Sequence, residues 1–372
     1  MAEPGRIPGA ARSVIGCPLM LAGLLALAGQ AVSIADAQAQ SPQIAGDTVE
    51  IPRDLAPYIA LRRLDQRVTS VSYRLLRANM PYCHKRMWHV GWQLHLLASY
   101  GDKDKAKRAY GLREGYVGIA AIAPDSPAAG LGLSVGDNIA FTRHADPLDP
   151  ENGDAVREAP ETLGDLQALE AMLQRRFEQA EQDIVWLPGN AAGKAQWARL
   201  SPLLPVRTCR SRFQIAPSKK RDASTDGDLV TITSRLAELT RDDDELAAVL
   251  AHEIAHNLLR HPDKLDAAGI DGGVFGPLGK DAEAIKMTEI EADRLSVWLM
   301  ANAGFDPEGA IRFWTHYGKR FGKGIFSAPT HYRWRKRVAL FEEEIAAMAR
   351  TRRDANGLLP PPLLISGGAE ID

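Results

Sequence analysis

The most informative stretch of this 372-residue chain is Asp243-Asp244-Glu245-Leu246-Ala247-Ala248-Val249-Leu250-Ala251-His252-Glu253-Ile254-Ala255-His256-Asn257-Leu258-Leu259-Arg260-His261. Acidic residues crowd its start, where they complement the helix dipole, and its body contains alanine and leucine without glycine or proline. Asp242 and Glu245 have the spacing of a capping pair. The pattern therefore predicts a helix that begins near Asp243.

The two histidines inside this helix predict a metal site. His252 and His256 are four residues apart, so they lie one turn above the other on one face, where both imidazoles can reach one ion. Glu253 lies about 100° round the helix from His252, close enough to contact a metal-bound water. His261 follows His256 by five residues and points away from the ligand face, which predicts a supporting or packing role.

A hydrolytic zinc site needs a third protein ligand, because it uses three and keeps the fourth position for water. The best source is Glu289-Ile290-Glu291-Ala292-Asp293, near the start of another helix that runs to about Ala303. Glu289 and Asp293 share one helix face, whereas Glu291 lies about 200° from Glu289 and cannot join it at the same ion. Helical geometry permits Glu289 with Asp293, or Glu291 alone, and does not choose between them.

The segments containing His252 to His256 and Glu289 to Asp293 resemble the family of zinc metallopeptidases that includes HtpX, the CAAX prenyl endopeptidase and the periplasmic protease BepA. The resemblance covers roughly residues 211–340. It implies one zinc ion per chain, with Glu289 as the third ligand. It also implies that Asp293 orients a zinc-binding histidine, which agrees with the need to fix an imidazole tautomer from outside the ligand set.

The same resemblance extends to the mechanism. Zinc held by the three ligands would lower the pKa of its water and polarise the scissile carbonyl. Glu253 would take the proton and deliver it to the leaving amine. His331 and Arg337 are similar to the family's late histidine and arginine, and His331, with Arg337 nearby, would donate to the developing oxyanion.

Short apolar runs separated by glycine, proline and aspartate fill residues 88–204. They predict strands at 90–94, 115–122, 138–142, 183–187 and 195–200, and one helix at 162–177. Residues 126–133, followed by Gly136-Asp137-Asn138-Ile139, resemble a PDZ domain of the bacterial type. The resemblance implies a peptide groove beside that helix, with Val90, Gly91 and Trp92 presenting backbone amides to a C-terminal carboxylate. A spacer of PDZ shape that binds nothing is the alternative.

The remaining segments complete an α+β organisation. Apolar residues at steps of three and four predict a helix over 57–80, and short apolar runs predict strands at 212–216 and 228–233. We expect a mostly helical, gluzincin-type catalytic domain with a small edge sheet and an inserted PDZ-like, β-rich domain. The expected boundaries are a signal peptide at 1–39, the first catalytic helix at 40–84, the PDZ-like domain at 85–205, the catalytic domain at 206–350 and a disordered tail at 351–372.

The first forty residues predict export. Arg6 and Arg12 precede an apolar run whose densest part is residues 19–28, and Ala37-Gln38-Ala39 supplies a small-x-small cleavage site. The predicted location is the periplasm. An uncleaved anchor, which would associate the chain with the inner membrane, is the alternative.

Composition excludes several classes of protein. With 45% apolar and 25% charged residues, the chain is neither fibrous, disordered nor polytopic in a membrane. A net charge of -2 removes the electrostatic argument for a nucleic-acid partner. After signal cleavage Cys83 and Cys209 remain, in a compartment that permits disulfides. They are either paired or two separate buried thiols.

These observations predict a zinc metalloendopeptidase that hydrolyses envelope proteins in protein quality control. Its partners would be protein or peptide substrates, including C-termini in the PDZ-like groove, and membrane association stays open. The competing prediction is a peptide-binding assembly factor or chaperone with a structural zinc and little proteolysis. The position of Glu253 between the histidines favours the enzyme, because a structural site has no use for it.

Overall fold

The computed structural model describes residues 52–114, 116–142, 155–156, 163–179, 184–187, 198–199, 203–270, 280–321 and 333–365. Residues 51–372 form one compact unit. The predicted signal peptide and the predicted catalytic residue His331 lie outside the described residues. None of the described helices is long and apolar enough to cross a membrane.

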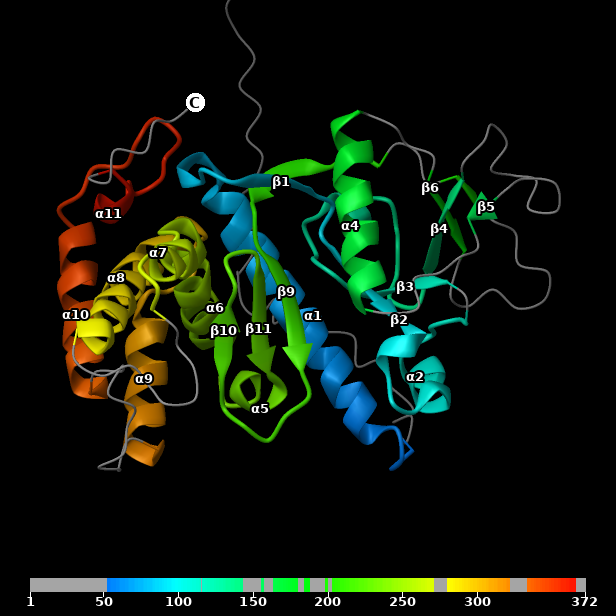
Figure 1. Cartoon of the computed structure of the whole chain (residues 1–372), viewed down its shortest axis with the longest axis horizontal. Coiled ribbons are helices and arrows are strands. Elements are labelled where there is room, and N and C mark those ends of the chain that lie inside the picture. Colours follow the sequence, from blue (N-terminus) through cyan, green and yellow to red (C-terminus); the bar gives the residue numbers. More distant parts are fainter. Residues whose placement is uncertain are drawn as a thin grey trace, which may run out of the picture. The chain divides into compact units, whose positions relative to one another are not determined.

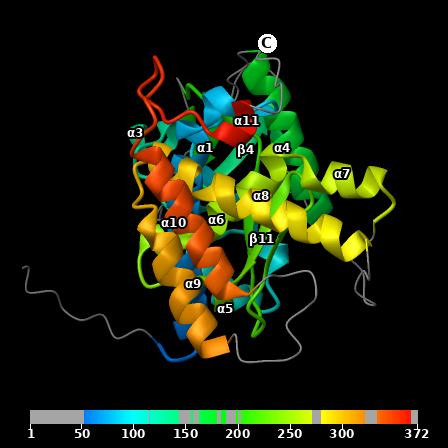
Figure 2. The ribbon, with the colours of Figure 1, turned by 90° about the vertical axis from the view of Figure 1, so that its left-hand side faces the viewer.

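A helical layer surrounds the segment that contains His252 and His256. That segment forms α6 (Asp243–Leu258), which packs against α1 (Ala56–Ala78), α8 (Lys280–Asn302) and α9 (Glu308–Phe321), while α10 (Trp334–Met348) packs against α8 and α9 (Figure 2). The helix expected at 57–80 is confirmed as α1, whose buried face contributes to the same core as α6. This core is large because α6 is apolar on nearly every side.

A three-stranded sheet lies beside α6. Its strands are β9 (Arg212–Ala216), β10 (Ala223–Thr225) and β11 (Leu229–Thr233), in the order β10-β11-β9, and α5 (Ser234–Ala237) follows directly (Figure 1). β11 runs parallel to β9 and antiparallel to β10. The strand predicted at 212–216 is confirmed, and the one predicted at 228–233 begins one residue later. β10 forms one border of this sheet.

A second sheet with its own core occupies the middle of the chain. Neighbouring strands are antiparallel in the order β2-β3-β4-β6-β7, and β5 pairs with β4. Its core includes residues of α4, which confirms the helix expected at 162–177. The bounds are α2 Lys103–Tyr110, α3 Pro127–Gly130, α4 Leu163–Glu178, β2 Trp92–Leu96, β3 Val117–Ile122, β4 Asn138–Thr142, β5 Ala155–Val156, β6 Ile184–Leu187 and β7 Ala198–Arg199.

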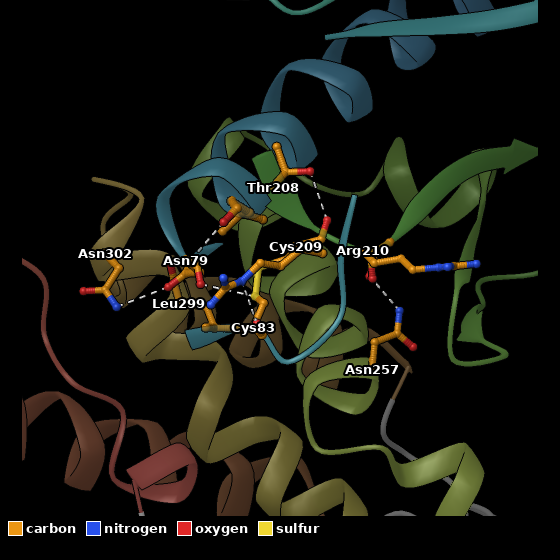
Figure 3. The surroundings of a disulfide bond; sticks show 11 residues. Asn79, Cys83, Thr208, Cys209, Arg210, Asn257, Leu299 and Asn302 are labelled. Atoms are coloured by element: carbon orange, nitrogen blue, oxygen red, sulfur yellow. Dashed lines mark hydrogen bonds between the residues drawn. A yellow bond between two sulfur atoms is a disulfide. The ribbon is translucent and has the colours of Figure 1, made fainter. Parts of the chain in front are cut away.

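The chain enters and leaves this middle region side by side. β1 (Arg86–His89) pairs antiparallel with β8 (Val206–Cys209), although 117 residues separate His89 from Val206. Directly beside this pair, Cys83 and Cys209 form a disulfide whose Cα atoms are 5.4 Å apart (Figure 3). The structure thus decides for the paired alternative. Neither β1 nor β8 was predicted, because each is too short to show a period.

The C-terminal segment corrects the expectation of a disordered tail over residues 351–365. Asn302 donates from Nδ2 to the Leu359 carbonyl at 2.9 Å and accepts from the Leu359 N–H at 2.6 Å. Tyr82 donates to Asp354, and α11 (Pro362–Ile365) follows. Leu359 is buried in the helical core, so apolar burial holds a segment that proline-rich composition suggested would be free.

Candidate metal centre

The start of α6 is held by the side chains that the sequence indicated. Asp242 caps the helix by accepting the Glu245 N–H at 2.8 Å, and Glu245 accepts the Arg241 N–H at 2.9 Å. The expected capping pair is confirmed, with the return bond made one residue earlier than in a capping box. The rigid, buried helix that follows fixes where His252, Glu253 and His256 project.

His252, His256 and Glu289 converge from α6 and α8. The Nε2 atoms of the two histidines are 3.2 Å apart, and the Glu289 carboxylate oxygens lie 3.5 Å from His252 Nε2 and 3.4 Å from His256 Nε2. Tetrahedral zinc with bonds of about 2.0–2.1 Å requires ligand atoms about 3.4 Å apart. The distance at His252 is to Oε2 and the one at His256 is to Oε1, so the three groups lie at separations close to those that one zinc ion requires.

Asp293 supports His252 from behind. Its carboxylate lies 2.9 Å from His252 Nδ1, which leaves Nε2 for the ligand cluster. Arg337 of α10 donates from Nε to Asp293 at 2.7 Å and also from Nη2, while its guanidinium stacks 3.5 Å from the centre of the Trp314 ring. Burial alone would raise the pKa of Asp293, but the charge of Arg337 and the bond to His252 hold it below its ordinary value.

The structure places Arg337 behind His252. Its Nε and Nη2 atoms contact Asp293, and Nη2 lies 3.4 Å from His252 Nδ1. Asp293 is fully buried and Arg337 is 4% exposed, so the pair is shielded from water. Arg337 therefore positions His252 through Asp293.

His256 is supported by His261, whose own contact with Glu291 the sequence did not predict. His261 Nδ1 lies 3.0 Å from His256 Nδ1, and His261 Nε2 lies 3.0 Å from a Glu291 carboxylate oxygen. Burial, aided by the neighbouring His256, lowers the pKa of His261 to about 3, so the ring is neutral. The bonds are satisfied when His256 donates from Nδ1 to His261, which donates from Nε2 to Glu291. The supporting role expected of His261 thus has a definite geometry.

These contacts show which of Glu289 and Glu291 belongs to the ligand cluster, a choice that helical geometry did not make. Glu289 lies in the ligand cluster, and Glu291 lies on His261. In the structure without metal, burial would raise the pKa of Glu289, but hydrogen bonds from the two histidines hold it far below its ordinary value. Burial would lower the pKa of His252, but Asp293 and Glu289 raise it to about 10.

Glu253 lies next to the cluster on α6 and is 7% exposed. Burial raises the pKa of its carboxyl above the ordinary value. A glutamate with a raised pKa beside a metal site is suited to accept and return a proton near neutral pH.

Asn257 joins α6 to the small sheet directly after His256. Its Oδ1 accepts from Thr225 of β10 at 2.7 Å, and its Nδ2 donates to Ser211 at 2.8 Å. Ser211 follows the disulfide-bonded Cys209 by two residues. The sequence did not predict a role for Asn257, although its position directly after the ligand His256 indicates one.

The turn at Val90, Gly91 and Trp92 differs from the predicted carboxylate-binding loop. The Gly91 N–H already donates to His89 Nδ1 at 2.7 Å, and the Gly91 and Val90 carbonyls accept from Ala123 and Ala128. Gly91 has φ +84°, and a Cβ there would meet Ser126 at 2.0 Å. The glycine is required for a close internal contact, and its amide is not available to a peptide carboxylate.

Two comparisons with known proteins agree with this geometry. Residues 215–270 match the profile of Peptidase family M48. The mitochondrial metalloendopeptidase OMA1 of Schizosaccharomyces pombe is 31% identical over 140 residues, which cover 32% of this chain and 41% of that protein. The chain thus spans about two fifths of the length of this relative. Both findings support a metallopeptidase of family M48, and the profile match contains α6.

Proposed function

We propose that this protein is a zinc-dependent endopeptidase. The observation that carries the proposal is the convergence of His252, His256 and Glu289 at the separations that one zinc ion requires, with Glu253 beside them. The match to Peptidase family M48 supports the same reaction class.

The chain's own residues have separable tasks in this proposal. When bound, zinc supplies a Lewis acid that polarises the scissile carbonyl and lowers the pKa of the attacking water. Glu253 accepts the proton of that water and returns it to the leaving amine. Asp293 with Arg337, and His261 with Glu291, hold the two histidines in the tautomers that leave Nε2 unprotonated. His331 stays the predicted donor to the oxyanion.

The test compares zinc content and casein cleavage in the wild type, Glu253→Gln and Glu342→Gln. Glu253→Gln should keep zinc and lose cleavage, because only the proton acceptor is removed. Glu342 is exposed on α10 and serves as the matched control, so its variant should behave as wild type. His252→Ala should lose zinc as well as activity. Cleavage retained in Glu253→Gln would contradict the assignment of the base.

The substrates and location that we propose are those expected from the sequence. The substrates are misfolded or misassembled envelope proteins, and the location is the periplasm, with association to the inner membrane as the alternative. Proteome-wide comparison of fragments from cells with wild-type protein and with Glu253→Gln would test the substrate class. Fragments shared by both strains would speak against envelope proteolysis by this chain.

A second function, peptide binding in the middle region, is supported by a cavity of about 320 Å³ between α4 and the segment from β1 to β2. Trp88, Trp92, Gln174 and Phe177 are among the residues that line it. The Trp88 indole N–H is buried, and it has no hydrogen-bond partner among the described residues. A peptide carbonyl in the cavity would satisfy this donor.

The edge of β2 offers a second contact in that cavity. Ile122, which lies opposite Trp92, uses both its N–H and its carbonyl on the Gln66 side chain. In an antiparallel pair, residues opposite each other turn their backbone groups the same way, inward or outward. The Trp92 N–H and carbonyl therefore face the outer edge of the sheet, where an extended peptide can add as a strand.

Matched peptides with free and amidated C-termini distinguish this mode from carboxylate capture. Titration of the full-length Glu253→Gln variant should show equal affinity for both forms, because strand addition does not use the terminal carboxylate. A clear preference for the free carboxylate would restore the loop mechanism predicted from the sequence. The absence of binding to either peptide would leave the region as a spacer.

A further inference from the structure

Four exposed cations form a cluster that we call the basic rim, consisting of Arg221, Arg241, Lys319 and Arg320. They come from three segments, which are the loop before β10, the loop before α6 and the last turn of α9. The guanidinium groups of Arg221 and Arg320 lie 4.2 and 5.2 Å from the centre of the same Phe321 ring. Arg241, Lys319 and Arg320 line a cavity of about 470 Å³. Three of the four cations thus line one cavity, and Arg221 joins them through the Phe321 ring that it shares with Arg320.

The rim lacks the carboxylates that neutralise arginines elsewhere. At the opposite end of α9, Arg312 lies within 3.8 Å of Asp242, Asp244 and Asp306. Within the described residues, no carboxylate lies within 4.0 Å of a charged group of the rim. Glu238, the acidic residue that lines the cavity, pairs with Arg235 at 3.2 Å. The rim therefore carries uncompensated positive charge.

Helix stabilisation explains only half of the rim. Cations in the last turn of a helix interact favourably with its dipole, which accounts for Lys319 and Arg320. Arg221 and Arg241 lie in loops, so an interaction with the C-terminal end of a helix dipole does not explain them. Stacked guanidinium groups are held in place while their N–H donors stay open to a planar anion, and a carboxylate is the anion that fits them in pairs.

The rim begins where the border strand β10 begins. The Asp222 carbonyl accepts from Thr233 N–H and the Asp226 N–H donates to the Leu229 carbonyl, so these residues face β11. The alternation of an antiparallel ladder then turns the backbone groups of Ala223 and Thr225 to the outer edge. This edge lies beside α6, to which Thr225 is bonded through Asn257 (Figure 1).

We propose that the basic rim selects peptide substrates with acidic side chains, which bind it while the substrate backbone pairs with the outer edge of β10. This inference rests on the proposed endopeptidase function and adds the substrate class. An extended chain advances about 3.4 Å per residue, so Arg221 lies about 7 Å along the strand from Ala223. The acidic residue is therefore expected about two residues beyond the end of the pairing at Ala223.

Peptide binding to the full-length, zinc-loaded Glu253→Gln variant tests the proposal without cleavage. Two fluorescent peptides differ only in having glutamate and aspartate, or glutamine and asparagine, at the positions beside the centre. The acidic peptide should bind about 5- to 20-fold more tightly at low salt, and the preference should shrink as salt is added. Arg221→Gln combined with Arg241→Gln should abolish the preference. Arg352→Gln, an exposed arginine of the C-terminal segment, is the matched control and should keep it.

The outcomes separate this inference from the proposed function. Equal affinity for the two peptides, or a preference that survives in the double variant, overturns the inference. Rim-dependent binding to phosphatidylglycerol vesicles or to single-stranded DNA, without a preference between the peptides, also overturns it in favour of another polyanion. Preferential binding of the acidic peptide, together with a zinc-loaded wild type that cleaves neither peptide, would keep the rim and refute the endopeptidase function instead.

Discussion

Reduction of the Cys83–Cys209 disulfide should destabilise the protein strongly. The two cysteines are 126 residues apart in sequence, and the loop that they close contains the whole middle region. Both cysteines lie in the helical core, Cys83 five residues after α1 and Cys209 at the end of β8, and both are at most 3% exposed. Asn79, whose side chain donates to the Leu75 and Leu299 carbonyls, places its own backbone carbonyl 3.2 Å from the Cys83 sulfur (Figure 3).

The loop length sets the size of the effect. Closing a loop of 126 residues removes about 16 cal/mol/K of entropy from the unfolded chain in the chain-entropy treatment. At 25 °C this corresponds to about 5 kcal/mol of stability. Native disulfides commonly contribute about 2–5 kcal/mol, so we expect a loss of at least 3 kcal/mol on reduction.

The assay is urea unfolding followed by tryptophan fluorescence, with oxidised and reduced samples of the same protein. With an m-value of about 3 kcal/mol/M, a loss of 3–5 kcal/mol lowers the midpoint by about 1–1.7 M. The Cys83→Ala/Cys209→Ala variant is the control, because reductant should leave its midpoint unchanged. A midpoint that moves by less than about 0.3 M on reduction, or that moves equally in the variant, would refute the reasoning.

Three further predictions concern the metal centre and the middle region. Glu289→Ala should weaken zinc binding by at least 100-fold more than Glu291→Ala, because only Glu289 contributes a ligand atom to the cluster. Zinc titration against a chromophoric chelator measures the two affinities, and the reverse order would mean that Glu291 is the ligand. His261→Phe should weaken zinc binding by about 10- to 100-fold, because it removes the acceptor for His256. His316→Phe breaks a similar contact to Glu245 away from the ligands and should leave zinc binding unchanged, so equal affinities in the two variants would argue that His261 does not support His256. Burial lowers the pKa of His89 to about 4, below the ordinary value of 6.5, so the unfolded chain binds more protons than the folded one between these pH values. Up to about 3 kcal/mol of stability should therefore be lost as the pH falls from 7 to 4. In urea titrations His89→Gln should reduce this dependence of stability on pH, and an unchanged dependence would assign it to other groups.

Local periodicity was enough to determine the part of the site that lies on one helix. Spacing within α6 placed His252, Glu253 and His256 together, because a helix of regular pitch fixes the relative directions of residues one turn apart. The same reasoning predicted α1, α4 and β9 closely. It also established that Glu289 and Glu291 could not serve the same ion.

Only the tertiary structure decided which face of α8 turns toward α6. That choice makes Glu289 a member of the cluster and places Glu291 on His261. The packing of α10 on α8 also brings Arg337 to Asp293, 44 residues earlier in the sequence, where it supports His252. The Cys83–Cys209 pair was undecidable from sequence for the same reason. Periodicity describes directions within one element, whereas contacts between distant elements depend on how their apolar faces pack, which no local spacing encodes.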